Sequence, residues 1–265
     1  MWETIIVNPF TNILLIIYKL FGSGPHSFGV AIILFTILIR VVTYPLMTSQ
    51  IKSSQKMQQL QSNPKWQEMQ KKYKGDKEKL AQEQMKLYKE LGISPLSSCL
   101  PMIIQIPIIF GLYQSIMRAI AASPGQLHIL QNVVWPVFDL QKLIPVNSTF
   151  LWMNLGQPER VYMFGFGVPV LAILVAITTY IQSKVTMVPS ANPKDQSAMM
   201  NNMMTLYMPL LLFYFSLNYA SGLAVYFIIS NILGVAQYAL MGKVNWANLI
   251  PGRKPSPPQL AGGNK

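Results

Sequence analysis

The chain has 265 residues, of which 51% are hydrophobic and only 11% are charged. About a quarter of the residues of a soluble domain are charged, so this composition excludes an ordinary soluble protein and indicates an integral membrane protein. The 21 Lys and Arg outnumber the 9 Asp and Glu, and most of the lysines crowd between Lys52 and Lys89. This basic stretch either suits an anionic lipid, RNA or acidic peptide partner or only sets the membrane topology.

The first two predicted elements are a short amphipathic helix and a membrane span. Apolar residues recur at helical spacing from Pro9 to Phe21, and the Gly22 to Pro25 stretch ends this segment after about a dozen residues. Such a helix is too short to cross about 30 Å of hydrocarbon, so we expect it to lie in the membrane interface. Gly29 to Met47 then gives an apolar run of about 19 residues, broken by Arg40, which predicts the first span.

The stretch from Ile51 to Leu91 changes abruptly to Lys, Gln, Glu and Met. Pro64 is placed like a first-turn helix residue, and Gly75-Asp76 is placed like a turn, so the pattern predicts two helices in a hairpin. A solvated coiled-coil spacer is the alternative interpretation.

Four further apolar runs predict four more spans, and they are Leu96 to Met117, Val161 to Ile181, Met203 to Leu217 and Gly222 to Met241. Pro101 and Pro107 should kink or locally unwind the first of these runs. The residues between 119 and 160 are too polar and too rich in Pro to span.

These elements predict an all-α integral membrane protein with five transmembrane helices, an N-terminal interfacial amphipathic helix and a cytoplasmic helical hairpin. Most Lys and Arg fall on the side of the hairpin and the C-terminal tail, so that side should be cytoplasmic, with the N-terminus outside and the C-terminus inside. The predicted boundaries are 1–28 for the external N-terminus and interfacial helix, 29–50 for the first span, 51–93 for the hairpin, 94–118 for the second span, 119–160 for an external segment, 161–182 for the third span, 183–202 for a cytoplasmic loop, 203–219 and 221–242 for the last two spans, and 243–265 for the cytoplasmic tail.

Arg40 is the first candidate functional residue, because a charge near the middle of a span costs about 2.5–3.5 kcal/mol on insertion scales. Either it faces a water-filled cavity, or it is a structural arginine bonded to the carbonyls of a kinked neighbouring helix. Other polar residues in the spans could line one groove with Arg40 or could act singly as hydrogen-bonding partners between helices. These residues are Thr36, Gln105, Gln114, Gln182, Ser230, Asn231 and Gln237.

Enzyme motifs are missing from the sequence. It contains no G-x-S-G and no H-E-x-x-H, no Asp falls within a predicted span, and His26 and His128 lie outside the spans. The lone Cys99 can form no internal disulfide, CxxC pair or zinc cluster. We therefore expect no enzyme activity, no catalytic residues, no cofactor and no metal. A small anion transporter that uses Arg40 is the alternative function, although the sequence shows none of the internal repeats that transporters usually carry.

Three stretches carry a resemblance to the YidC/Oxa1/Alb3 family of membrane protein insertases. They are AIILFTILIRVVTYPLMTSQIKSSQKMQQLQ, YKGDKEKLAQEQMKLYKELGISPLSSCLPMIIQIPIIFGLY and SGLAVYFIISNILGVAQY, in that order along the chain. Together with the sequence between them, the resemblance covers approximately residues 5–243, and the chain is similar to the bacterial YidC type that lacks a large external domain.

The resemblance implies a protein that inserts nascent membrane proteins into the bilayer through a positively charged hydrophilic groove, open to the cytoplasm and the lipid and closed on the outside. Arg40 matches the groove arginine of the family and Thr36 lies one turn before it. Relatives have Tyr where this chain has Phe227, so a role for a hydroxyl is not expected there. The predicted groove residues are Arg40, Thr36, Gln105, Gln182, Tyr226, Phe227, Asn231 and Gln237, and the predicted client-capture residues of the hairpin are Lys56, Lys65, Lys71, Lys72 and Lys86.

The resemblance also implies partners and a location. Nascent membrane protein clients and membrane lipids are the expected partners, the ribosome and the Sec translocon are further candidates, DNA is not expected, and the chain should function as a monomer. The N-terminus lacks the features of a signal or transit peptide, so we expect a multi-pass protein of the bacterial inner (plasma) membrane, with the thylakoid membrane as the alternative.

Overall fold

The computed structural model describes residues 1–61, 66, 68–69, 72–73, 75–90, 100–121, 123–136, 143–163, 166–186, 203–242, 244 and 246–249. Most of these residues are helical. The elements in chain order are the π-helix η1 (Glu3–Val7), α1 (Asn8–Leu20), α2 (Ser27–Gln61), α4 (Lys77–Glu90), α5 (Leu100–Ile120), α6 (Pro124–Val133), β1 (Thr149–Phe150), β2 (Met153–Asn154), β3 (Val161–Met163), β4 (Phe166–Val168), α8 (Val170–Thr186), the π-helix η3 (Met203–Tyr207), α10 (Met208–Asn218), α11 (Ser221–Leu240) and the 3-10 helix η4 (Trp246–Leu249).

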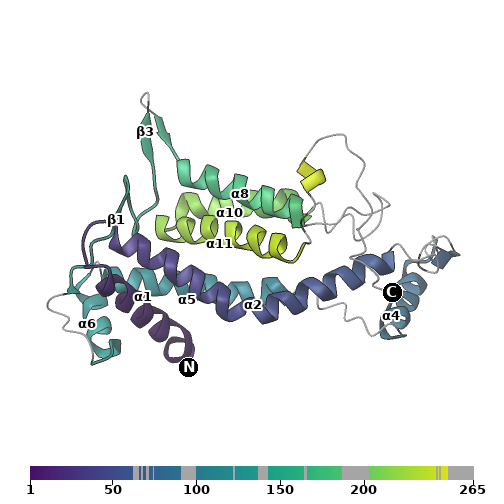
Figure 1. The fold of residues 1–265 in the computed structure, drawn as a ribbon, viewed down its shortest axis with the longest axis horizontal. Coiled ribbons are helices and arrows are strands. Elements are labelled where there is room, and N and C mark those ends of the chain that lie inside the picture. The colour runs from purple at the N-terminus through teal and green to yellow at the C-terminus, as the bar shows by residue number, and fades with distance from the viewer. Residues whose placement is uncertain are drawn as a thin grey trace.

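The long helices form one packed body from which the hairpin projects (Figure 1). α8 packs against both α10 and α11, α11 packs against α2, and α1 packs against α2 and α5. The helix α4 lies at the opposite end of α2 from α1 and α6, and these are called below the hairpin end and the α6 end of the molecule (Figure 1).

A cluster of buried apolar side chains occupies the α6 end. Phe28, Ile32 and Phe35 of α2 are completely buried against Leu112 and Ile116 of α5. Gly222 lets α11 approach closely, since a Cβ there would lie 3.1 Å from both Ile32 Cδ1 and the Leu155 carbonyl oxygen. Apolar side chains of α2, α5 and α11 therefore pack closely together at this end of the helix body.

The N-terminal helix is longer than the sequence analysis predicted. The predicted start at Pro9 is wrong, because the π-helix η1 continues the helix back to Glu3 and Pro9 lies where the π-helix passes into α1. The combined segment from Glu3 to Leu20 has 18 residues and is apolar enough to cross a membrane. Its placement in the interface stays a prediction.

The first predicted span and the start of the hairpin form one continuous helix. The predicted boundary at residue 50 falls inside α2, which runs for 35 residues to Gln61 and passes through Pro45. Residues 51–61 contain neither Gly nor Pro, so nothing in their sequence stops a helix before Asn63-Pro64. α5 likewise continues through Pro107, and Pro101 lies in its first turn.

The third predicted span begins later than expected. β3 and β4 pair antiparallel where the helix was predicted to start, and α8 begins only at Val170. Pro169 explains the difference, because a residue that precedes proline is disfavoured in the helical conformation, and Gly167 adds little helix propensity. β1 and β2 form a second small ribbon, so the helical fold carries two short antiparallel pairs among its described residues.

Five spans stay a prediction of the sequence. The described residues include four helical segments that are long and apolar enough to cross a membrane, namely Glu3–Leu20, Ser27–Ser53, Ile103–Ile120 and Ser221–Leu240. Val170–Thr186 and Met203–Asn218 are apolar but shorter.

Candidate functional site

Arg40 joins α2 to α11. Its Nη2 donates to the Ser230 carbonyl oxygen at 2.7 Å and to Ser230 Oγ at 2.6 Å. A helix carbonyl keeps a second lone pair after it accepts its own helical hydrogen bond, so Ser230 can receive the guanidinium without breaking α11. The structure thus gives Arg40 the carbonyl contact expected of a structural arginine, but this contact uses only one of its three nitrogens.

A small cavity lies beside Arg40 on the hairpin side of the apolar core. α2 contributes Thr36, Ile39, Arg40, Thr43 and Met47 to its lining, α5 contributes Gln105 and Ile108, and α11 contributes Tyr226. Thr36 Oγ1 and Thr43 Oγ1 donate to carbonyls of their own helix, those of Ile32 and Ile39, at 2.7 Å each. The cavity is consequently lined by one cation, several hydroxyls and one amide within an otherwise apolar body.

Gln105 and Tyr226 bridge two helices at this cavity. Gln105 Nε2 donates to Tyr226 Oη at 2.6 Å, which connects α5 to α11. Four predicted groove residues, Thr36, Arg40, Gln105 and Tyr226, therefore line one cavity although they come from three helices.

Gln182 of α8 lies beside Arg40 at the surface of Gly234. A Cβ built on Gly234 would lie 2.5 Å from Gln182 Nε2 and 3.5 Å from Arg40 Nη2. Both polar groups therefore rest against the bare backbone of α11 at this glycine.

The other three predicted groove residues lie away from the cavity. Asn231 Nδ2 donates to Thr179 Oγ1 at 2.8 Å and to Thr178 Oγ1 at 3.1 Å, so it joins α11 to α8. Phe227 is buried in the apolar core with its ring centroid 5.6 Å from that of Tyr226. Gln237 is buried near the end of α11.

Some polar residues at the site were not predicted as groove residues, and Ser230 was named only among the polar span residues that could line a groove. Thr43 follows Arg40 by three residues and Ser230 follows Tyr226 by four, so helical spacing places each on a face that the sequence analysis had already singled out. Thr178 and Thr179 carry no comparable signal, because the sequence does not say which helix will face Asn231.

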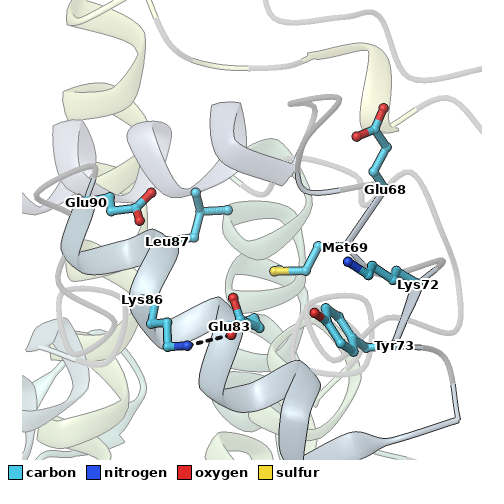
Figure 2. Close-up of a pocket in the computed structure, with 8 residues that line it drawn as sticks. All are labelled: Glu68, Met69, Lys72, Tyr73, Glu83, Lys86, Leu87 and Glu90. Carbon is cyan, nitrogen blue, oxygen red and sulfur yellow. Dashed lines mark hydrogen bonds and ion pairs between the residues drawn. The ribbon is translucent and has the colours of Figure 1, made fainter.

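A cleft lies between α4 and the segment before it (Figure 2). Met69 and Leu87 are the apolar residues of its lining. Lys86 Nζ donates to Glu83 Oε1 at 2.6 Å, and this hydrogen bond raises the pKa of Lys86. The full lining is Glu68, Met69, Lys72, Tyr73, Glu83, Lys86, Leu87 and Glu90.

Trp66 holds the two arms of the hairpin together. Its ring stacks on Tyr88 of α4 with centroids 5.7 Å apart, and Trp66 is only 5% exposed. Burial also raises the pKa of the Tyr88 hydroxyl. The two arms thus pack through a buried Trp66 and a half-buried Tyr88, which a helical hairpin and a coiled-coil spacer would both allow.

The predicted capture lysines are only partly described. Lys72 and Lys86 line the hairpin cleft, and Lys72 Nζ lies 5.5 Å from the centroid of the Tyr73 ring. Lys56 belongs to α2, but its side chain falls outside the described residues, as do Lys65 and Lys71. Within the described part of the chain, no group of three or more His, Cys, Asp or Glu could hold a metal ion.

The comparisons with known proteins agree with this architecture. A family model described as the 60Kd inner membrane protein matches residues 17–247. The chain belongs to this family. Membrane protein insertase YidC 2 of Bacillus anthracis is 34% identical over 244 residues, which cover 91% of this chain and 80% of that protein.

Two further relatives extend the comparison. Membrane protein insertase MisCA of Bacillus subtilis (strain 168) is 32% identical over 269 residues, which cover 100% of this chain and 85% of that protein. The crystal structure of an active YidC insertase with its first transmembrane domain resolved superposes with a TM-score of 0.52 at 23% identity, over 86% of this chain and 45% of that chain. At this identity the superposition shows the fold alone. The bacterial relatives and the apolar helices identify a multi-pass protein of the bacterial inner membrane.

Proposed function

We propose that this protein is a membrane protein insertase and chaperone that passes the polar segments of nascent membrane proteins through a positively charged hydrophilic groove, of which the cavity beside Arg40 is part. The single observation that carries the proposal is the convergence of Arg40, Gln105 and Tyr226 from three helices on one cavity within an apolar body. Membership of the 60Kd inner membrane protein family and the insertase names of the relatives support the function.

The physical task of an insertase explains why a polar cavity is useful. Each unsatisfied polar group of a client costs several kcal/mol in hydrocarbon, so a client's hydrophilic tail crosses unaided only rarely. Hydroxyls and an amide lower that cost by offering hydrogen-bond partners. The apolar segment of the client meanwhile leaves sideways into lipid.

Arg40 adds an electrostatic preference for acidic clients. A cation attracts a carboxylate far more strongly where the local dielectric constant is low than it does in water. With one nitrogen held by Ser230, the guanidinium is fixed in place and its charge is still available to the cavity. Acidic residues of a translocated tail should therefore gain more from the groove than neutral polar residues do.

The hairpin is the proposed site of first contact with the client. Lys56, Lys65, Lys71, Lys72 and Lys86 make it basic, and its cleft combines Met69 and Leu87 with charged walls. A flexible thioether beside leucine adapts to many apolar side chains. The hairpin lies on the cytoplasmic side in this proposal, with the N-terminus outside, and a monomer is the working unit. The ribosome and the Sec translocon are candidate partners.

Reconstitution tests the proposal and separates it from anion transport, which a buried cation could also serve. Purified protein in lipid vesicles should protect the translocated tail of a single-span client from added protease, compared with empty vesicles. The same vesicles should show no flux of chloride or phosphate above background. Anion flux without client protection would replace the insertase proposal with a transporter.

A further inference from the structure

One face of α2 runs from the cavity to the hairpin. Thr36, Arg40, Thr43 and Met47 line the cavity, and Gln50 follows Met47 by three residues and Thr43 by seven. Helical spacing of three, four and seven residues places all five on the same face. At 1.5 Å per residue, Gln50 lies about 15 Å from Arg40 towards the hairpin.

Gln50 differs from the other polar residues of this face in its hydrogen bonding. Thr36 and Thr43 donate to their own helix and Arg40 donates to Ser230. Gln50 is only 5% exposed, and within the described part of the chain both its Nε2 and its Oε1 are buried without a hydrogen-bond partner. A buried amide that bonds to nothing costs about 1–3 kcal/mol, so such groups call for an explanation.

Other unpartnered polar atoms occur at this level of the molecule, although Thr48 lies about 200° around α2 from Gln50 and therefore on another face of the helix. α2 and α11 run side by side in the same direction, because Ile32 contacts Gly222 and, further along both helices, Arg40 contacts Ser230. In both pairs the residue of α11 has a number higher by 190. The same offset sets Gln237 level with Met47. Of the five described residues with a buried, unpartnered side-chain atom, three lie near this level, namely Thr48, Gln50 and Gln237, and the other two, Gln126 and Ser216, lie elsewhere.

The chemistry of Gln50 fits one kind of ligand. A polypeptide that leaves water in an extended form carries alternating N–H and C=O groups, all of which need partners. A glutamine amide supplies a donor and an acceptor at once, so it can bond to the main chain of a client whatever its side chains are. A carboxylate or an ammonium group would instead select clients by charge.

We propose that Gln50 is a main-chain binding residue at the hairpin end of the groove, where it hydrogen-bonds the backbone of the entering client. This inference rests on the proposed insertase function and deepens it. Gln50 acts on all clients alike and Arg40 discriminates by charge, so the two residues divide recognition between them.

The test replaces the amide by an apolar group of similar size. Gln50→Leu should lower the rate of client insertion in reconstituted vesicles by roughly tenfold, the loss expected for one or two hydrogen bonds, and equally for acidic tails and for tails neutralised to Asn and Gln. It should leave the thermal unfolding temperature unchanged or raise it, because an unsatisfied buried amide has been removed. Gln131→Leu, the same change at an exposed position on α6, is the matched control and should alter neither insertion nor its charge dependence.

A second measurement locates the contact directly. In a Cys99→Ser background, Gln50→Cys should form disulfides with single cysteines placed along a ribosome-bound client, at positions that move along the client as the chain is lengthened. The assignment of Gln50 would be overturned if Gln50→Leu inserted clients at the wild-type rate or had a lower unfolding temperature. It would also be overturned if Gln50→Cys formed no disulfide at any client length. Failure of the wild-type protein to insert any client would instead overturn the proposed function itself.

Discussion

Gly234 is the residue that lets Gln182 and Arg40 share one surface of α11. A methyl group at this position would press on the far end of the Gln182 side chain, which can swing away, and alanine gains about 1 kcal/mol of helix propensity over glycine. We therefore expect Gly234→Ala to change the free energy of unfolding by less than about 1 kcal/mol and to retain insertion. Gly234→Leu would extend into the Arg40 contact with Ser230 and should reduce insertion of clients with acidic tails several-fold.

Protease protection of client tails, with thermal unfolding of each purified variant, checks both substitutions. Gly234→Ala serves as the control for the loss of glycine as such. Equal activity of the two variants would mean that the guanidinium position does not depend on this close approach.

The residue scale also shows what sequence can and cannot predict. Arg40 stands out because a charge within an apolar run is costly, and Thr36 follows from helical spacing. Periodicity assigns a face to a side chain but not the helix that it meets. Asn231 therefore turned towards Thr178 and Thr179 on α8 instead of the cavity, and Phe227 joined the apolar core.

Among the elements, the hairpin has an aromatic contact between the described parts of its two arms. Removing the Trp66 ring takes away a buried surface and its stack on Tyr88, and truncations of this kind cost about 3–5 kcal/mol in a well-packed core. Trp66→Ala should therefore open the hairpin, with faster proteolytic cleavage between residues 62 and 90, and should leave the unfolding temperature of the membrane helices unchanged.

Tyr88→Phe is the matched control for the hairpin, because it keeps the stacked ring and removes only the hydroxyl. The Tyr88→Phe protein should be cleaved by the protease at the wild-type rate. If Trp66→Ala were also cleaved at the wild-type rate, the two arms would be held together by contacts other than this ring pair.

Element boundaries were the least predictable part of the fold. The hydropathy pattern located the apolar helices, but it continued through Val161 to Val168, where antiparallel pairing and Pro169 delay the helix to Val170. The change in composition predicted a boundary near Ile51. No Gly or Pro ends the helix there, and α2 continues to Gln61. A change in polarity marks a change of surroundings, and a helix can pass through it unbroken.

At the scale of the whole molecule, the apolar core and the cavity lie at different levels along α2. Phe28, Ile32 and Phe35 are fully buried, and Thr36 to Met47 follow them towards the hairpin. This order supports a groove that is closed at the α6 end and reached from the hairpin end. If clients enter from the cytoplasm, as we propose, the hairpin is cytoplasmic and the loops at the α6 end are external.

Cysteine labelling tests this orientation. In a Cys99→Ser background, cysteines at Ser62 and Gly156 should react with a membrane-impermeant thiol reagent from opposite sides, with Ser62 modified only from the cytoplasmic side. Cys99→Ser alone gives the unlabelled control. Modification of both positions from the same side would contradict the topology.

The charge of Arg40 is the most direct test of the account as a whole. Arg40→Ala should slow insertion of single-span clients with acidic external tails about tenfold or more, and should slow the same clients with those residues changed to Asn or Gln much less, because neutral tails gain nothing from the charge. Arg40→Lys should retain part of the activity, since the positive charge survives while the guanidinium fork is lost.

The decisive measurement is protease protection of paired acidic and neutralised client tails in vesicles that contain equal amounts of wild-type, Arg40→Lys and Arg40→Ala protein. A groove that attracts acidic segments predicts a loss in Arg40→Ala that is several-fold larger for the acidic member of each pair. An equal loss for both members, accompanied by a lower unfolding temperature, would show that Arg40 only fastens α2 to Ser230 on α11 and would contradict the electrostatic mechanism.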